Sequence, residues 1–467
     1  MRAFRLFQHH VSYSTLLELF ADSVLCFVAA LAVASAFQVV PGNDADFALD
    51  AGMIWVATQF AVVMLLLYSF VGLYRTSSVP VQRGSIVRRA LLALMVGAFI
   101  AYVLFHSVAG QVSAGRLLGL VVLLLASLIV VRVGMFAFRR AVGAPRVLIV
   151  GSGPEAHRVA QDLAAQHRIE RELVGFYPTS EEIHPGLPAT RMFPRSQTIT
   201  EIVARNQIDE IIVATREHRG GQVSMDQLLT CRIQGTPVLD MAGFYELTRA
   251  IVPIDGLKAS WLIYGDGFVQ GRARQAAKRA FDIVSSATLL LLAAPVMLLT
   301  ALAIRLDSPG PVIYRQERVG LGGRSFMCLK FRSMRTDAEK DGVARWATQG
   351  DTRVTRVGAF IRKSRIDELP QLFSVLRGEM SMVGPRPERP AFVEQLREQI
   401  PFYDVRHSVK PGVTGWAQVR YSYGASVEDA RQKHQYDLYY VKNNSLFLDL
   451  LVLIETVSVV LFREGAR

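Results

Sequence analysis

The sequence contains few cysteines and few charged residues for its length. Only three of its 467 residues are cysteines, and Cys26, Cys231 and Cys328 lie far apart, in no spacing typical of a zinc site or a disulfide framework. Charged residues make up 20% of the chain, whereas hydrophobic residues make up 51%. This balance is unusual for a soluble protein and indicates membrane segments. The scattered cysteines receive no role, and cytoplasmic exposure fits them best.

Acidic residues are also in deficit. The chain has 52 Lys or Arg but only 40 Asp or Glu, which gives a formal net charge of +12. Residues 305–366 carry most of the excess, with 14 Lys or Arg against 6 Asp or Glu. A basic segment of this kind predicts a phosphate-rich partner or an anionic membrane surface. The length of the chain is enough for about three domains.

Four apolar stretches open the chain, at roughly 18–40, 53–74, 86–109 and 117–138. Each is near the ~20 residues that a membrane-spanning helix needs, and cleavable signal peptides do not occur in fours. The segments before the first stretch, between the second and third, and after the fourth are basic, while the segment between the first two is acidic. The positive-inside rule therefore predicts a four-helix bundle, residues 1–140, with both ends in the cytoplasm.

Residues 145–250 alternate between strand-like and helix-like segments, which predicts a small Rossmann-like parallel α/β domain. Residues 151–156, GSGPEA, have the G-x-G-x-x-A form of a dinucleotide-binding turn. No Asp or Glu ends the second predicted strand, where a ribose-binding acid is expected. Two interpretations stay open: a scaffold domain whose turn only packs helix on strand, which the missing acid favours, and an NAD-binding domain.

A fifth apolar segment, residues 281–304, follows an expected linker at 251–271. Pro295 lies near its middle, and both flanks are basic. A membrane-crossing helix usually has asymmetric flanks, and proline kinks a helix by removing a backbone donor. We therefore expect a re-entrant helix that turns at Pro295 and returns to the inner face, with an ordinary fifth span as the alternative. The last apolar run, residues 445–462, keeps two acidic residues and is expected to be a buried or interfacial helix.

Glycines and basic residues that suit a diphosphate follow the fifth segment. Gly320, Gly322 and Gly323 allow a tight turn. Five basic residues surround this turn: Arg315, Arg318, Lys330, Arg332 and Arg335. Guanidinium forks hold phosphate oxygens in a set geometry, so a diphosphate site is one interpretation. The other is a hairpin whose solvated basic edges hold lipid headgroups.

Two adjacent carboxylates, Asp367 and Glu368, stand just ahead of Pro370, which is well placed to begin a helix that Gly378 ends. The helix dipole and the basic residues just upstream should favour both carboxylates as anions. An ionised carboxylate can attack phosphorus, and an adjacent one can hold a Mg²⁺ ion. Acidic residues in a first helical turn are also ordinary capping groups, and for an arbitrary Asp-Glu pair capping is the commoner explanation.

The longer phrases around this pair resemble those of the bacterial sugar transferases, also called monotopic phosphoglycosyl transferases or polyprenyl-phosphate hexose-1-phosphate transferases. The matching phrases are YRQERVGLGGRSFMCLKFRSM, TRVGAFIRKSRIDELPQLFSVLRGEMSMVGPRPE and RHSVKPGVTGWAQV. A four-span bundle followed by a small α/β domain is similar to the large members of that family. Residues 423–445 look most like the branch associated with exopolysaccharide export.

The resemblance implies a catalytic domain over residues 272–467 and a reaction in two steps. Asp367 would attack the β-phosphorus of a UDP-sugar, form an aspartyl phosphosugar and release UMP, and undecaprenyl phosphate would then accept the sugar phosphate. Glu368 would be the carboxylate associated with Mg²⁺, the expected cofactor. Three basic residues are the expected substrate contacts: Lys330, Arg332 and Arg386, the last within the Pro-Arg-Pro motif.

The same resemblance implies a multi-pass protein of the bacterial inner membrane with its catalytic domain on the cytoplasmic face, because UDP-sugars are cytosolic. We expect no nucleic-acid partner; the hexose and any homo-oligomer stay open. Two alternatives also stay open: a non-catalytic membrane scaffold that binds anionic lipid, and a nucleotide-sugar dehydratase or epimerase that uses the turn at 151–156. Such dehydratases need a Tyr-x-x-x-Lys pair, and no tyrosine here has a lysine four residues on.

Overall fold

The structure is a computed structural model. It describes residues 3–6, 9–35, 51–74, 83–109, 114–165, 171–180, 182–215, 224–255, 257, 259–264, 267–268, 271–336, 338, 353–421, 424 and 426–462. The chain forms two compact units, one of residues 1–6 and 10–249 and the other of residues 7–9 and 250–467. Each unit is described separately.

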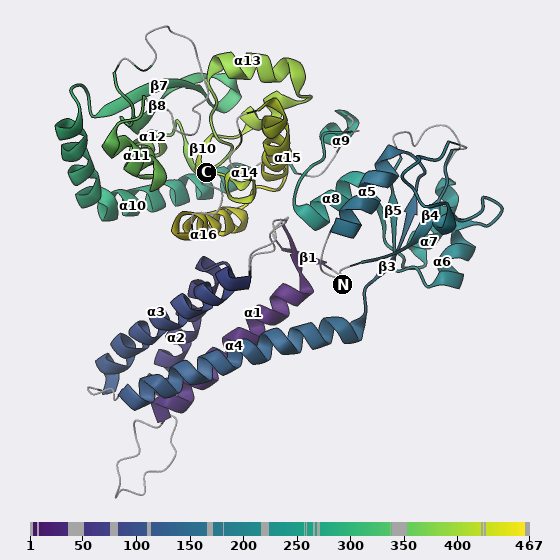
Figure 1. The fold of residues 1–467 in the computed structure, drawn as a ribbon, viewed down its shortest axis with the longest axis horizontal. Helices are drawn as coiled ribbons and strands as arrows, with labels where there is room; N and C mark the ends of the chain where they lie inside the picture. The colour runs from purple at the N-terminus through teal and green to yellow at the C-terminus, as the bar shows by residue number, and fades with distance from the viewer. Residues whose placement is uncertain are drawn as a thin grey trace, which may run out of the picture. The chain divides into compact units, whose positions relative to one another are not determined.

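Long apolar helices open the first unit, after the short strands β1 (Ala3–Leu6) and β2 (His9–Ser12). These helices are α1 (Tyr13–Ser35), α2 (Ala51–Phe70), α3 (Arg83–Ala109) and α4 (Ala114–Val142) (Figure 1). α1 packs against α2 and α4, and α2 packs against α3. Large apolar side chains such as Trp55, Phe99 and Phe136 are exposed, so the helices are apolar on all sides, as in a membrane.

A parallel four-stranded sheet forms the rest of the first unit, in the order β4-β3-β5-β6. Its strands are β3 (Arg146–Val150), β4 (Glu172–Tyr177), β5 (Glu210–Val213) and β6 (Val238–Asp240). Its helices are α5 (Pro154–Ala165), η1 (Ala189–Arg191), α6 (Ile199–Asn206), α7 (Met225–Ile233) and α8 (Met241–Arg249). All four residues of β5 are buried, as expected for a strand covered on both faces. The predicted parallel α/β architecture is confirmed.

The second unit combines short strands with many helices (Figure 1). An antiparallel hairpin joins β7 (Ile313–Val319) to β8 (Ser325–Phe331) through η2 (Leu321–Gly323), and β9 (Ser381–Val383) pairs in parallel with β10 (Gly412–Thr414). Its helices are α9 (Ala259–Tyr264), α10 (Arg272–Asp307), α11 (Arg356–Lys363), η3 (Ile366–Glu368), α12 (Gln371–Arg377), α13 (Pro390–Gln399), η4 (Tyr403–Ser408), α14 (Trp416–Arg420), α15 (Val427–Asn443) and α16 (Leu446–Phe462).

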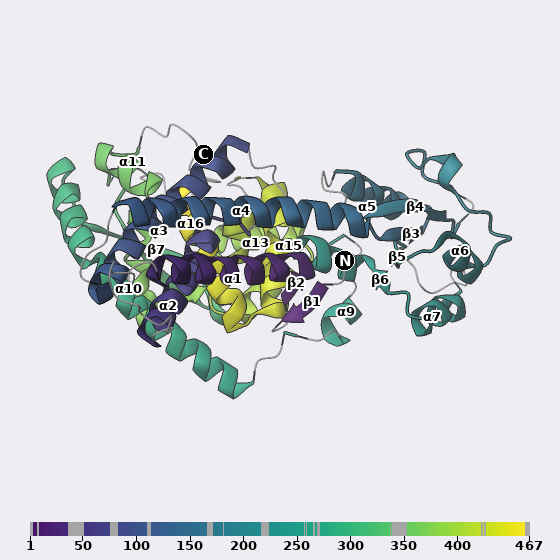
Figure 2. The same ribbon diagram turned by 90° about the horizontal axis from the view of Figure 1, so that it is seen from below.

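Helix α10 contains the predicted membrane segment and Pro295. Figures 1 and 2 show that the ribbon of this 36-residue helix changes direction part-way along, so the helix is bent. Arg279, in the first half, donates hydrogen bonds of 2.6 Å to two carbonyl oxygens at the end of α12. Ile304, in the second half, is buried against β8 and α11. Both halves of the bent helix are therefore anchored to the same domain.

Among the described residues, five helices are long and apolar enough to cross a membrane: α1 to α4 and α10. Four spans and a re-entrant α10 remain a prediction, because length and composition do not distinguish a re-entrant helix from a span. The acidic loop at 41–50 and much of the basic connection after α2, on which the predicted orientation rests, lie outside the described residues.

The chain enters the second unit through a packed segment rather than an exposed one. Val252 is fully buried, and its amide donates to the carbonyl oxygen of Gln435 at 3.0 Å. The indole of Trp416 donates to the carbonyl oxygen of Ala250 at 2.9 Å. The first residues of the expected linker thus pack against α14 and α15.

Helix α16 buries one face, including Asp449, which forms an ion pair of 2.8 Å with Lys278 of α10.

Candidate active site

The acid pair occupies a short 3₁₀ turn, η3, between α11 and α12. Arg365, just ahead of it, has a left-handed backbone with φ of 59°, which turns the chain sharply at this point. Pro370 is the N-cap of α12, and Gly378 ends that helix with φ of 89°. The predicted helix and its stop are thereby confirmed. Asp367 and Glu368 stand ahead of the helix, and both are largely buried.

One oxygen of Glu368 collects three cations from different parts of the domain. Lys330 on β8 lies 3.1 Å from Oε1, Arg386 after β9 lies 3.1 Å from it, and Arg365 lies 3.7 Å from it. The Lys330 ammonium and the Arg386 guanidinium both donate hydrogen bonds to this oxygen. Among the described residues, none hydrogen-bonds to the carboxylate of Asp367. Ion pairs therefore hold one acid of the pair, whereas its neighbour accepts no hydrogen bond from these residues.

The two carboxylates also differ in their pKa values. Burial and the adjacent Glu368 raise the pKa of Asp367 from 3.8 to about 6, against the opposing effect of Lys330, Arg365 and Arg386. Burial also disfavours ionisation of Glu368, but the same three cations hold its pKa well below its usual range. The expectation that the surroundings favour both carboxylates as anions is therefore right for Glu368. For Asp367 its direction is wrong, because desolvation outweighs the cations, although a pKa of about 6 still leaves this carboxyl mostly ionised at neutral pH.

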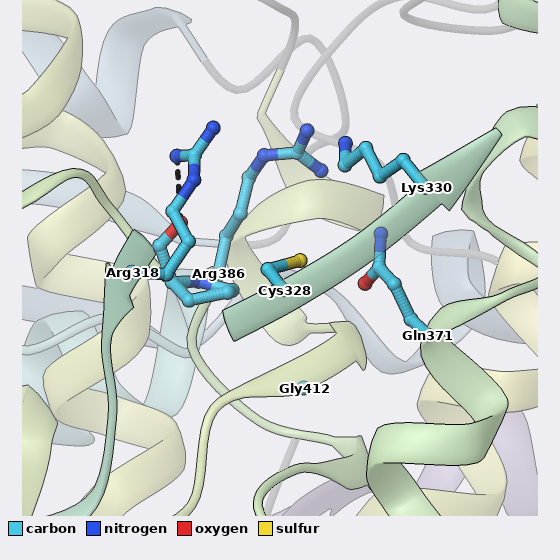
Figure 3. Close-up of a pocket in the computed structure, with 7 residues that line it drawn as sticks. Arg318, Cys328, Lys330, Gln371, Arg386 and Gly412 are labelled. Carbon is cyan, nitrogen blue, oxygen red and sulfur yellow. Dashed lines mark hydrogen bonds between the residues drawn. The ribbon is translucent and has the colours of Figure 1, made fainter. Parts of the chain in front are cut away.

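Lys330 and Arg386, the two residues that donate to Glu368, also line a small pocket (Figure 3). Its lining residues come from five segments: Arg318, Cys328, Lys330, Gln371, Arg386, Pro387 and Gly412. In Figure 3 the Arg386 guanidinium and the Lys330 ammonium point toward each other at one side of the pocket. Three of the lining side chains carry positive charge, which suits a ligand with phosphate groups.

The loop that carries Arg386 is held close to β10. The amide of Gly384 donates to Thr414 at 2.9 Å, and the amide of Gly412 donates to Pro385 at 3.0 Å. A Cβ on Gly384 would clash with the carbonyl oxygen of Lys410, so the close approach of the two chains requires glycine. Prolines on both sides restrict the backbone of Arg386. The Pro-Arg-Pro motif is thus rigid, and it presents its arginine to the pocket.

Arg332 lies elsewhere, although it was expected to contact phosphate. Strand β8 ends at Phe331, and the buried guanidinium of Arg332 turns to the end of α10. There it donates to the carbonyl oxygens of Ser308 at 2.7 Å and Pro309 at 2.9 Å. The structure brings together Asp367, Glu368, Lys330 and Arg386, and it places Arg332 at the C-terminal end of α10. Pro295 lies within that helix.

Some pocket residues were not among the expected contacts. Gln371 is one of them, and its only signal in the sequence is its position four residues after Asp367, one helical turn on. Arg318 belongs to the basic hairpin, but the sequence does not distinguish it from Arg315 on the same strand. Burial lowers the pKa of Arg318, and its guanidinium donates to the carbonyl oxygen of Pro387 at 3.0 Å.

The donor set of the acid pair fits Mg²⁺. Mg²⁺ prefers oxygen ligands and is commonly held by one or two carboxylates together with substrate phosphates. Within the described ranges, no group of three or more His, Cys, Asp or Glu side chains could hold a metal ion. A Mg²⁺ ion at the acid pair would therefore need further ligands, such as phosphate oxygens of the substrate. Oε1 of Glu368 faces the cations, whereas no described residue hydrogen-bonds to Oε2. That oxygen and the Asp367 carboxylate are the available ligands.

The glycine-rich turn of the α/β domain is covered by the chain itself. Gly151 has a φ of 153°, and a Cβ there would clash with the carbonyl oxygen of Ala214 after β5. Ser152 is fully buried, and its carbonyl oxygen accepts a hydrogen bond of 2.8 Å from the amide of His184. The His184 ring stacks on His157 of α5 at 4.5 Å. The segment after β4 thus packs over the start of α5.

The chain thus has helices long and apolar enough to cross a membrane, and its second unit has a cationic pocket whose Lys330 and Arg386 pair with a buried acid; both features suit a membrane-associated enzyme that binds a phosphate-bearing substrate. A family model described as bacterial sugar transferase matches residues 273–463, and one described as CoA-binding domain matches residues 69–225. The chain belongs to the bacterial sugar transferase family.

Three curated relatives illustrate the similarity. The UDP-N-acetylgalactosamine-undecaprenyl-phosphate N-acetylgalactosaminephosphotransferase of Aeromonas hydrophila is 45% identical over 51% of this chain and 56% of its own length. The undecaprenyl-phosphate glucose phosphotransferase of Komagataeibacter xylinus is 36% identical over 69% and 60%. The UDP-glucose:undecaprenyl-phosphate glucose-1-phosphate transferase of Xanthomonas campestris pv. campestris is 33% identical over 70% and 69%. The chain thus spans little more than half of the first two relatives.

Coenzyme A is implied by the second family model, but the turn at Gly151 does not fit its diphosphate. A diphosphate needs exposed amides at the start of the helix. Here Ser152 is buried, and Glu155, in the first turn of α5, places a carboxylate oxygen 3.3 Å from where a Cβ of Gly153 would lie. This acid would repel a phosphate at the turn.

Proposed function

We propose that this protein transfers a hexose 1-phosphate from a UDP-sugar to undecaprenyl phosphate at the cytoplasmic face of the inner membrane. The product would start the assembly of an exopolysaccharide or another glycan. The observation that supports this most directly is the division of roles in the acid pair: three cations hold Glu368, while Asp367 beside it has no hydrogen bond from any described residue. The names of the relatives support the same reaction.

In the first step, an oxygen of the Asp367 carboxylate attacks the β-phosphorus of the UDP-sugar. The new bond joins this oxygen to phosphorus, and the bond between the β-phosphorus and the bridging oxygen breaks. UMP leaves with the electron pair of that bond, and the sugar phosphate stays on Asp367. A carboxylate whose pKa is about 6 is mostly ionised at neutral pH, and it retains more basicity than an ordinary aspartate.

In the second step, a phosphate oxygen of undecaprenyl phosphate attacks the same phosphorus. The bond to Asp367 breaks, and the carboxylate leaves with its electron pair, ready for another cycle. Lys330, Arg365 and Arg386 stand where they can neutralise phosphate oxygens in both steps. Mg²⁺ held by Glu368 would supply further charge neutralisation on the diphosphate.

The direct test is UMP release from a panel of UDP-sugars by the purified protein, with and without undecaprenyl phosphate. The panel should include UDP-glucose and UDP-N-acetylgalactosamine, because the relatives are named for both sugars. Stoichiometric release without acceptor and turnover with it are expected, and excess EDTA should stop both. A protein that binds anionic vesicles but releases no UMP from any donor would be a scaffold instead.

The cytoplasmic placement of the site requires that both ends of α10 face the same side, with the bend at Pro295. Single cysteines at positions 272 and 335, in a cysteine-free background, test this with a membrane-impermeant thiol reagent on intact cells. Both should stay unlabelled until the membrane is opened. Labelling of position 335 alone would establish a fifth span. Replacing Pro295 with Ala should straighten the helix and reduce turnover by displacing the acid pair from the lipid phosphate.

A further inference from the structure

The Arg386 guanidinium can reach Glu368 only if the backbone of its loop is held in place. β10 holds one side of this loop through the Gly384 and Gly412 amides. The carbonyl oxygen of Arg386 itself accepts a hydrogen bond of 2.7 Å from Nη2 of Arg406. Arg406 lies in η4, twenty residues after Arg386. The second hold on the loop therefore comes from another arginine.

Arg406 is a buried charge with a built set of partners. Its residue is only 5% exposed. The same Nη2 that donates to Arg386 lies 2.9 Å from Oδ2 of Asp437 on α15, and Nη1 donates to the hydroxyl of Tyr403 at 2.7 Å. A buried guanidinium costs much free energy unless an opposite charge pairs with it, and Asp437 supplies that charge here. Asp437 and Tyr403 orient the fork of Arg406 toward the loop.

We infer that Arg406, oriented by Asp437, is a positioning residue for Arg386: it fixes the loop so that the Arg386 guanidinium meets Glu368 and the donor phosphates. This inference rests on the proposed function. A lysine at position 406 would keep the charge, but it would lack the planar fork that bridges the Arg386 carbonyl oxygen and Asp437. The loop would then lose its second hold.

The test is a double-mutant cycle in which kcat/KM for the UDP-sugar is measured. Arg406→Lys should lower kcat/KM for the UDP-sugar on the order of 10-fold, mainly through KM, since the change acts on substrate positioning. In an Arg386→Lys background the same substitution should have little further effect, because the group that it positions has gone. A residue that only stabilises the core would give effects that multiply in the double variant.

Two further variants serve as a control and as a second test of the inference. Arg397→Lys is the matched control. It alters an exposed ion pair between Arg397 and Asp404, a residue of the same η4 turn, and it should leave kcat/KM unchanged. Asp437→Asn keeps Arg406 but loosens its orientation. It should reproduce the loss more weakly, again only when Arg386 is present, and it decides the question if Arg406→Lys does not fold.

The outcomes separate the positioning role from the proposed function. The same cycle is run on the affinity for UDP, measured by calorimetry on the detergent-purified full chain, so it does not depend on turnover. An active wild type whose Arg406 and Arg386 effects multiply in both assays would overturn the positioning role alone. A wild type that neither releases UMP nor binds UDP would overturn the proposed function, and the positioning role with it.

Discussion

Two turns of this chain depend on glycine for close backbone packing, but their surroundings differ. At Gly384 the close approach of the loop to β10 holds Arg386 out into an open, cationic pocket. At Gly151 the close approach to β5 leaves a turn that the segment after β4 covers, with a carboxylate at the start of the helix. Both glycines permit tight backbone packing. What differs is the set of side chains around them and whether the chain itself occupies the adjacent space.

The comparison shows that the spacing of glycines indicates where the backbone packs closely. By itself the spacing does not indicate that a ligand binds there. In this structure, backbone packing accounts for the glycine at position 151 of the G-x-G-x-x-A sequence at residues 151–156. The Gly-Pro-Arg-Pro sequence is satisfied by packing too, yet it also places a charged group opposite the acid pair. A glycine motif therefore becomes informative about function only together with the charges that face it.

The largest expected effect is at the open site. Asp367→Asn should abolish UMP release, because an amide cannot accept the phosphosugar. Ionising a carboxylate whose pKa is raised by burial opposes folding, so above pH 6 the variant should be at least as stable as the wild type. Turnover and thermal unfolding at pH 7.5 measure the two effects. Near-normal turnover in a preparation free of contaminating enzyme would rule out the covalent step.

Adding a methyl group to each turn tests directly whether the two glycines serve different purposes. Gly384→Ala should displace the Arg386 loop and lower kcat/KM on the order of 100-fold. Gly151→Ala should destabilise the α/β domain, by about 1–3 kcal/mol, because of its φ and its contact with Ala214, and leave kcat/KM nearly unchanged. Steady-state kinetics and limited proteolysis are the measurements. Equal losses of activity in the two variants would mean that the α/β turn takes part in catalysis.

The predictions from the sequence succeeded where local pattern decides and failed where tertiary burial decides. Hydrophobic runs, Pro370 and Gly378 placed the helices, and alternation placed the parallel strands. Lys330 and Arg332 look equivalent in the sequence, but β8 ends between them, so Arg332 turns toward α10. The raised pKa of Asp367 depends on desolvation by segments distant in the sequence. Arg406 contacts Arg386 through tertiary packing that no local pattern indicates.

A smaller effect concerns pH. If ionised Asp367 is the nucleophile, kcat/KM should fall as the pH drops below about 6, following the pKa of that carboxyl. The charged groups that act on it are Glu368, Lys330, Arg365 and Arg386. Arg365→Gln removes a cation that lowers this pKa, so the acidic limb of the profile should move to higher pH. A limb that does not move would assign the titration to another group.

The smallest expected signal is at the covered turn, where we predict no binding of NAD, NADP or coenzyme A. Each ligand would have to displace the segment hydrogen-bonded to Ser152 and place its diphosphate beside the Glu155 carboxylate. Calorimetry on the full chain tests this, with UDP as the positive control for the pocket at Glu368. A saturable isotherm at micromolar affinity, unchanged by Arg386→Lys, would show that the segment after β4 opens and that the two turns are both ligand sites.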